Sequence, residues 1–141
     1  MDFPKELLEE MKRLAREAAR NSYCRYSRFP VGAAVLTETG GIFTGCNVEN
    51  VSYGLTNCAE RTAVFKAVSE GCREIRVVVV YTPTGRATLP CGACRQVIHE
   101  FGPNALVKCF CDTDHRVETT LDRLLPHAFA STRLPRLNGP R

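Results

Sequence analysis

Three cysteines and a glutamate lie where two expected helices begin. The stretch "TNCAERTAVFKAV" (residues 56–68) places Cys58 and Glu60 in the first turn of a helix expected over 57–70, and "PCGAC" places Cys91 and Cys94 at the start of another, expected over 91–101. Helix N-termini stabilise thiolates through their free N–H groups and the positive end of the dipole. Thiolates are soft ligands that suit zinc. These residues therefore predict a metal site built from two helix starts.

Taken alone, the Cys-x-x-Cys pair of Cys91 and Cys94 fits either a redox pair or half of a zinc site. A redox pair has no use for Cys58, whereas zinc needs a third ligand. Three protein ligands leave the fourth position for water, as in catalytic sites, and four close the site, as in structural ones. Cys109 or Cys111, in the expected strand "ALVKCFC", could supply a fourth ligand to a structural zinc module. Both also fit buried small hydrophobic residues.

Glu60 has two possible roles. Asn57 and Glu60 have the spacing of a capping box, in which Glu60 would only cap its helix. A glutamate that is not a ligand can instead take a proton from a water activated by zinc and pass it on. Three thiolates on Zn²⁺ leave a charge of −1, which Arg61, Arg95 and the two helix dipoles would offset. A structural zinc module would leave the position of Glu60 unexplained.

The surrounding pattern predicts the elements that position these residues. Apolar residues at helical spacing predict a first helix over 7–19, and "VGAAVLTETGGIFTGCNV" (31–48) predicts two strands around a turn. Buried strands are expected over 74–82 and 105–111, and a short last helix from Thr119 or Thr120 to Pro126. Alternating strands and helices predict a layered α/β domain. Right-handed crossovers would bring successive helix starts to one edge of the sheet.

Length and charge set the broad class. The 141 residues fit one domain, and no apolar run approaches the ~18 residues of a membrane span. Charges interrupt the first 21 residues throughout, so we expect no secretory signal and a cytoplasmic protein. The net charge is +4, and the segment 131–141 carries three arginines and no acid. We expect residues 1–130 to form the domain and 131–141 a basic, flexible tail, with no groove for nucleic acid.

The motifs "CAE" and "PCGACRQ" together resemble the zinc signature of the cytidine deaminase superfamily, H-x-E with P-C-x-x-C and its three-cysteine variants. The stretches "YSRFPVGAAV" and "GCNVENVSYG" resemble the small cytidine deaminases of pyrimidine salvage, and the likeness runs from about Tyr23 to Phe129. Cys58 in place of histidine is similar to the small homotetrameric class. The resemblance implies a three-layer α-β-α fold with a mixed central sheet and one Zn²⁺ per chain.

The resemblance also implies roles for single residues. Cys58, Cys91 and Cys94 would hold zinc, Glu60 would shuttle protons, and Arg61 would hydrogen-bond the thiolates. Substrate contacts would come from six further positions: Asn47 and Glu49 on the sugar hydroxyls, the backbone of Ala59 on the base, Phe29 packed on the pyrimidine, and Tyr53 and Phe129 near a site completed across a subunit interface. From the residues alone, Phe29 and Phe129 also fit a core, and Asn47 and Glu49 a solvated loop.

The activity implied is hydrolytic deamination of cytidine and 2′-deoxycytidine to uridine and 2′-deoxyuridine, with release of ammonia. A nucleoside substrate, a homotetramer and no nucleic-acid or membrane partner go with it. A blasticidin-type or other aminopyrimidine nucleoside deaminase shares the zinc motifs and is the alternative enzyme, and an RNA- or DNA-editing deaminase comes after it. The alternative from outside enzymology is the structural zinc module.

Overall fold

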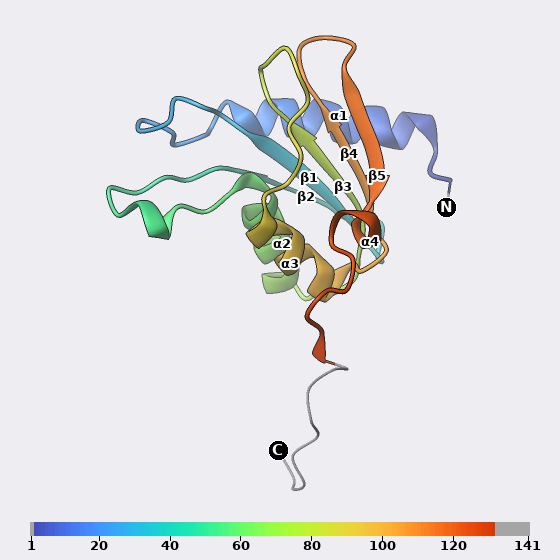
Figure 1. The fold of residues 1–141 in the computed structure, drawn as a ribbon. Coiled ribbons are helices and arrows are strands. Elements are labelled where there is room, and N and C mark those ends of the chain that lie inside the picture. The colour runs from blue at the N-terminus through green and yellow to red at the C-terminus, as the bar shows by residue number, and fades with distance from the viewer. Residues whose placement is uncertain (1, 132–141) are drawn as a thin grey trace, which may run out of the picture.

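The computed structural model describes residues 2–131, which form one mixed sheet with helices on both faces (Figure 1). Their elements, in chain order, are α1 (Lys5–Ala19), β1 (Gly32–Thr37), β2 (Ile42–Cys46), the 3₁₀ turn η1 (Tyr53–Leu55), α2 (Ala59–Ser69), β3 (Ile75–Tyr81), α3 (Gly92–Phe101), β4 (Leu106–Phe110), β5 (Arg116–Thr120) and α4 (Leu121–Leu124).

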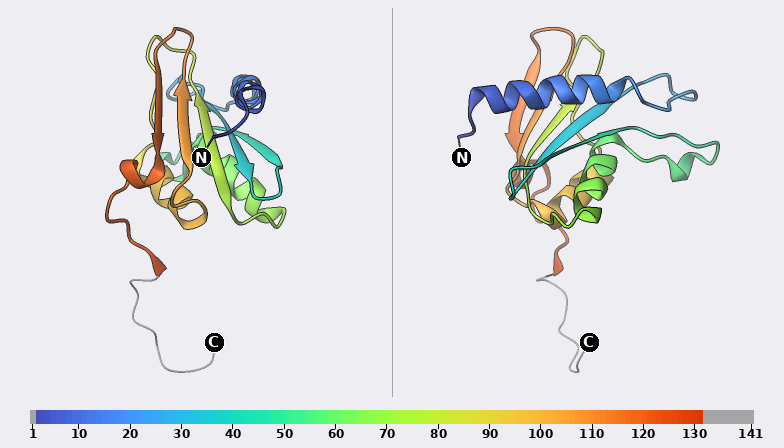
Figure 2. Two further views of the ribbon diagram at one scale, coloured as in Figure 1. Left: turned by 90° about the vertical axis from the view of Figure 1, so that its right-hand side faces the viewer. Right: turned by 180° about the vertical axis from the view of Figure 1, so that it is seen from behind.

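The sheet has the strand order β2-β1-β3-β4-β5. Strand β1 pairs antiparallel with both β2 and β3, β3 pairs parallel with β4, and β4 pairs antiparallel with β5. Helix α1 covers one face, as the right-hand view of Figure 2 shows, and α2 and α3 cover the other. The expected three-layer α-β-α fold with a mixed central sheet is therefore confirmed.

Two hydrophobic cores explain the apolar run of residues 77–81 in the central strand β3. In β3, Val77 and Val79 pack against α1, whereas Val78 and Val80 pack against α2 and α3. Successive side chains of a strand point to opposite faces, so a strand covered on both sides needs apolar residues at every position. The amphipathic helix predicted at the N-terminus supplies Met11 and Ala15, both fully buried, to the first of these cores.

The C-terminal part of the sheet differs from the expectation. Residues 116–120 form the edge strand β5, which was not predicted from the sequence. The last helix begins at Leu121 and ends at Leu124, so it is shorter than predicted. The segment "RVETT" has one apolar residue and no hydrophobic run, because an edge strand can leave one face and one side in water. Thr120 does stand at the N-cap of α4, but its side chain makes no capping hydrogen bond.

The tail expected over 131–141 lies, apart from Ser131, outside the described residues. Within residues 2–131, none of the helices combines the length and the apolarity that crossing a membrane requires.

Candidate active site

Helices α2 and α3 begin side by side, and each begins at a cysteine. Cys58 is the N-cap residue of α2 and Cys91 that of α3, and neither side chain makes a capping hydrogen bond. Glycine lets α2 approach the sheet closely: a Cβ on Gly45 of β2 would lie 2.5 Å from the backbone nitrogen of Ala63. This close contact fixes where the first turn of α2 lies.

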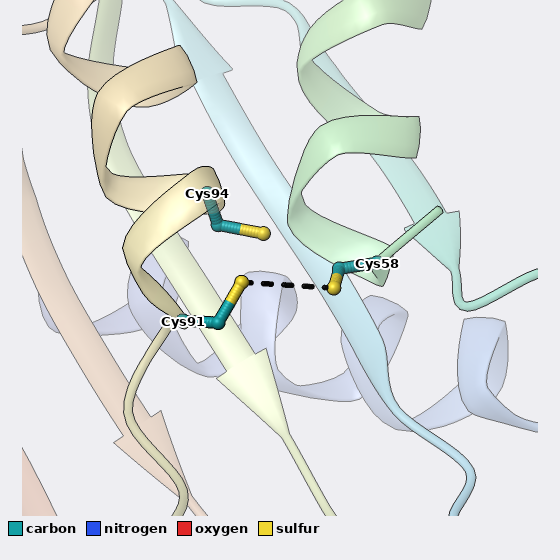
Figure 3. A group of neighbouring side chains, drawn as sticks. All are labelled: Cys58, Cys91 and Cys94. Atoms are coloured by element: carbon teal, nitrogen blue, oxygen red, sulfur yellow. Dashed lines mark hydrogen bonds between the residues drawn. The ribbon is translucent and has the colours of Figure 1, made fainter. Parts of the chain in front are cut away.

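The sulfur atoms of Cys58, Cys91 and Cys94 face one another between the two helix starts (Figure 3). All three Sγ atoms lie within 4.8 Å of one another, and those of Cys58 and Cys91 are 3.8 Å apart. Tetrahedral zinc with zinc–sulfur bonds of about 2.3 Å holds its sulfur ligands about 3.8 Å apart. The geometry therefore fits zinc without rearrangement of the backbone.

Within the described residues, this group contains three ligands and no fourth. Cys109 and Cys111, the fourth ligands that a structural zinc module would need, are 1% and 4% exposed and stand outside the group. Cys111 instead lies 3.2 Å from the carbonyl oxygen of His115. Both cysteines are buried, as the alternative of small hydrophobic residues predicted. A three-thiolate set leaves one zinc position for water, which is the arrangement of catalytic sites.

The two arginines beside the cysteines have different contacts. Arg61 donates a hydrogen bond to the Sγ of Cys58 over 3.2 Å, so its positive charge lies against the thiolate cluster. Hydrogen bonds from Cys94 first, and then from Arg61, lower the pKa of Cys58 to about 5. Arg95 donates to the carbonyl oxygens of Pro90 and Leu124 and not to sulfur. Charge compensation through a hydrogen bond therefore comes from Arg61, and Arg95 holds the turn before Cys91.

Glu60 is the second residue of α2 and not its third, because Cys58 occupies the N-cap. The capping-box interpretation is therefore wrong, and Asn57 donates to the hydroxyl of Thr62 instead. The side chain of Glu60 is 4% exposed and lines a cavity next to the cysteines. Burial raises the pKa of this carboxyl. A carboxyl whose pKa is raised holds a proton more readily, so it can both accept a proton and return it.

The cavity beside Glu60 has a volume of about 410 Å³, within the range of small-molecule sites. Seven of the residues predicted from the sequence line it: Phe29, Asn47, Glu49, Cys58, Ala59, Glu60 and Cys91. Within residues 2–131, its wall contains no lysine, arginine or histidine. Backbone N–H groups of Tyr26 and Ser27 bind Glu49, and hydrogen bonds from Ser27 lower the pKa of its carboxyl. Apart from the cysteines and Glu60, the charged side chain that lines this cavity among the described residues is therefore the Glu49 carboxylate.

Six further residues that the sequence interpretation did not name line the cavity: Ser27, Val31, Thr56, Val80, Thr88 and Leu89. Thr88 and Leu89 immediately precede "PCGAC". Because they are so near to Cys91 in the sequence, they could have been predicted to line the site. The others come from loops and strand ends whose residue types carry no chemical signature.

Tyr53 and Phe129 lie outside this cavity, 75% and 66% exposed. Tyr53 is in η1, between β2 and α2. Its ring packs edge-on against that of Tyr26, with the two ring centroids 5.8 Å apart. Phe129 follows α4, and its carbonyl oxygen accepts a hydrogen bond from Gln96 of α3. The two aromatic side chains therefore point to solvent in the single chain.

An open-sided zinc site with a buried acid beside it, at the edge of an α/β sheet, is the arrangement of metal-dependent hydrolases. The comparisons narrow this class. The model of the "cytidine and deoxycytidylate deaminase zinc-binding region" matches residues 5–110, and the chain belongs to that family. Zinc is the metal that this family domain binds, in agreement with the three-cysteine group.

Similar proteins cover nearly the whole chain. A cytidine deaminase of Sporosarcina psychrophila is 49% identical over 131 residues, which are 92% of this chain and 93% of that protein. The crystal structure of cytidine deaminase from Burkholderia pseudomallei is 44% identical, with a TM-score of 0.82 over 86% of this chain and 98% of that one. A blasticidin-S deaminase of Bacillus cereus is 34% identical over 104 residues, 68% of this chain and 74% of that protein.

Proposed function

We propose that this protein deaminates cytidine and 2′-deoxycytidine to uridine and 2′-deoxyuridine. The observation that carries the proposal is the cavity in which Glu60 lies beside the cysteine group, and which Asn47 and Glu49 also line. One water is consumed, the bond between C4 and its amino nitrogen breaks, and ammonia leaves.

The residues divide the chemistry as follows. Cys58, Cys91 and Cys94 would hold zinc, which when bound would supply an acidified water as the nucleophile. Glu60 accepts the proton of that water and passes it to N3 of the pyrimidine, which makes C4 electrophilic. After the water oxygen has bonded to C4, the same carboxyl takes the second proton, from the hydroxyl group on C4, and delivers it to the amine, so that the C4–N bond breaks, ammonia leaves and the C4 carbonyl forms. Because burial raises the pKa of Glu60, its protonated form is accessible between these transfers.

Charge favours a free nucleoside over a nucleotide. Among the residues that the structure describes, no cationic side chain lines the cavity to bind a phosphate, and the Glu49 carboxylate would repel one. Its oxygen Oε1 is occupied by two backbone N–H groups, which leaves Oε2 as an acceptor for a sugar hydroxyl. Ala59 and Phe29 both line the same cavity, as their proposed contacts with the base require.

An ammonia-release assay on the zinc-loaded protein tests this assignment, with cytidine, 2′-deoxycytidine, cytosine, CMP, adenosine and blasticidin S as substrates. We expect turnover of the two nucleosides and little of cytosine or CMP. Efficient turnover of cytosine, or a preference for CMP, would refute the nucleoside assignment. Blasticidin S is the second candidate, because a blasticidin-S deaminase is among the relatives, and preferential turnover of it would establish that alternative.

We further propose a homotetramer in which neighbouring subunits complete one another's sites. The support is apolar surface that a single chain leaves in water: Val51, Tyr53, Leu55 and Phe129 are between 66% and 78% exposed. Light scattering should give about four times the chain mass of 15.7 kDa. A fully active monomer would refute both parts of this proposal.

All eight cysteines are free, which supports a reducing compartment such as the cytoplasm.

A further inference from the structure

A short loop, residues 24–30, forms the wall of the cavity on which the base would lie. Ser27 and Phe29 line the cavity, and Val31 continues this wall at the end of the loop. Inside the loop, the N–H of Arg28 donates to the carbonyl of Cys24, and that of Phe29 donates to the hydroxyl of Ser27. Arg28 has a φ of 56°, in the left-handed region. Such a tightly turned loop needs external contacts to keep one conformation.

Those external contacts come from two side chains. Within residues 2–131, the backbone hydrogen bonds that the loop makes beyond itself end on Asn47 and Glu49. The N–H groups of Tyr26 and Ser27 both donate to Glu49 Oε1 over 3.0 Å. Asn47 Nδ2 donates to the carbonyl oxygen of Phe29 over 2.8 Å.

The amide of Asn47 is largely used by this backbone. Its Oδ1 accepts from the N–H of Val31 over 2.9 Å, so the one side chain holds both ends of the Phe29–Pro30–Val31 turn. Asn47 is 7% exposed and follows directly after β2. The main chain of Asn47 is also held, because its N–H donates to Val31 and its carbonyl accepts from Tyr23. The amide is therefore a fixed anchor with one N–H left for a ligand.

We propose that Asn47 is a positioning residue that holds Phe29 in place against the base, beyond any contact that it makes with the sugar. Glu49, which also lines the cavity, shares this task through Oε1. Recognition of the sugar and recognition of the base are then coupled. The residues that bind the hydroxyl groups of the sugar also hold in place the loop that packs on the pyrimidine. This inference rests on the proposed function.

The test uses a ligand without a sugar. 1-Methylcytosine carries the base alone, so a residue that touches only the sugar does not affect its binding. For Asn47→Ala in the zinc-loaded protein, we expect the inhibition constant of 1-methylcytosine to rise about tenfold, because two buried hydrogen bonds are lost. Hydrogen exchange of residues 26–31 should accelerate, with that of the central strands unchanged. An unchanged inhibition constant would overturn the inference.

Two more variants complete the design. Asn50→Ala is the matched control, because Asn50 lies on the same segment and its Oδ1 accepts only from the N–H of Ser52. Asn47→Asp keeps the acceptor for Val31 and loses the donor to Phe29, so it carries the same test if Asn47→Ala does not fold. A smaller rise than for Asn47→Ala is expected, and no rise would count against the inference.

A double-mutant cycle with Phe29→Ala gives the most direct reading. If Asn47 acts through Phe29, the second substitution adds little to the first, whereas independent roles give additive losses. Additive losses in the binding of 1-methylcytosine would overturn the inference. A wild-type protein that does not deaminate cytidine would refute the proposed function itself, whereas an active wild type with additive losses refutes only the role of Asn47.

Discussion

Replacing Glu60 by glutamine separates proton transfer from structure. Glutamine keeps the volume of a side chain that is 4% exposed, so the cavity should not collapse. Burial raises the pKa of the glutamate, which means that the folded protein gains nothing from its charge, and the neutral amide should not reduce stability. Glu60 stands outside the three-sulfur group, so we expect zinc to remain near one per chain.

The expected loss of activity is large because one carboxyl serves several transfers. A single positioned general base contributes roughly 10²–10⁴ in rate. Glu60 is asked to protonate both the ring nitrogen and the leaving amine, so kcat should fall by about 10⁴ or more, equivalent to about 5–6 kcal/mol of barrier. KM should change little, because Phe29, Asn47 and Glu49, which also line the cavity, are untouched.

The assay follows cytidine loss by ultraviolet absorbance and zinc by elemental analysis on the same preparation. Glu70→Gln is the matched control, since Glu70 is an exposed residue at the other end of α2, and it should retain full activity. An active Glu60→Gln enzyme would end the mechanism. A Glu60→Gln protein without zinc would show instead that the ligands were assigned wrongly.

Three other substitutions and deletions have distinct outcomes. Cys91→Ala should lose zinc and lower thermal stability together, since thiolate-bound zinc contributes on the order of 10 kcal/mol, and full zinc content by elemental analysis would contradict its role as ligand. Gly45→Ala should destabilise the fold by about 2–3 kcal/mol in urea titration, because its Cβ would meet the backbone of Ala63 at 2.5 Å. Gly85→Ala, with nothing within 4 Å, is the control and should be nearly neutral. Deletion of residues 132–141 should leave turnover and the melting temperature unchanged if residues 1–130 form the domain; a loss of either would extend the domain into the tail.

Much of the fold could be predicted because burial imposes periodicity. The apolar run of β3 and the helical stripe of α1 are direct results of which faces are covered. Strand β5 was missed because an edge strand needs only one covered face, and Val117 is its sole apolar residue. Hydrophobic patterning has no signal for a polar strand whose neighbour supplies the pairing.

The site divides in the same way. Cys58, Cys91, Cys94 and Glu60 could be picked out because few residue types do their chemistry. The two hydrogen bonds of Asn47 to the backbone of residues 29 and 31 could not, since an asparagine at a strand end is equally compatible with a solvated loop. The exact start of α2 was also not predictable. The spacing of Asn57 and Glu60 suggested Asn57 as the N-cap residue, but the helix begins one residue later, with Cys58 at the N-cap.

The two N-cap cysteines give the metal a part in chain folding. Cys58 and Cys91 are 33 residues apart, and a zinc ion that binds both closes the intervening chain, with α2 and β3 inside it, into a ring. A covalent cross-link around a loop of that length lowers the conformational entropy of the unfolded chain, which stabilises the folded state by about 4 kcal/mol. Bound zinc would therefore act as a reversible cross-link, and the fraction of chains that carry it would depend on the supply of the metal. In a cell short of zinc, newly made chains would have this ring open, and the pool of folded enzyme would follow the availability of the metal as well as the rate of synthesis.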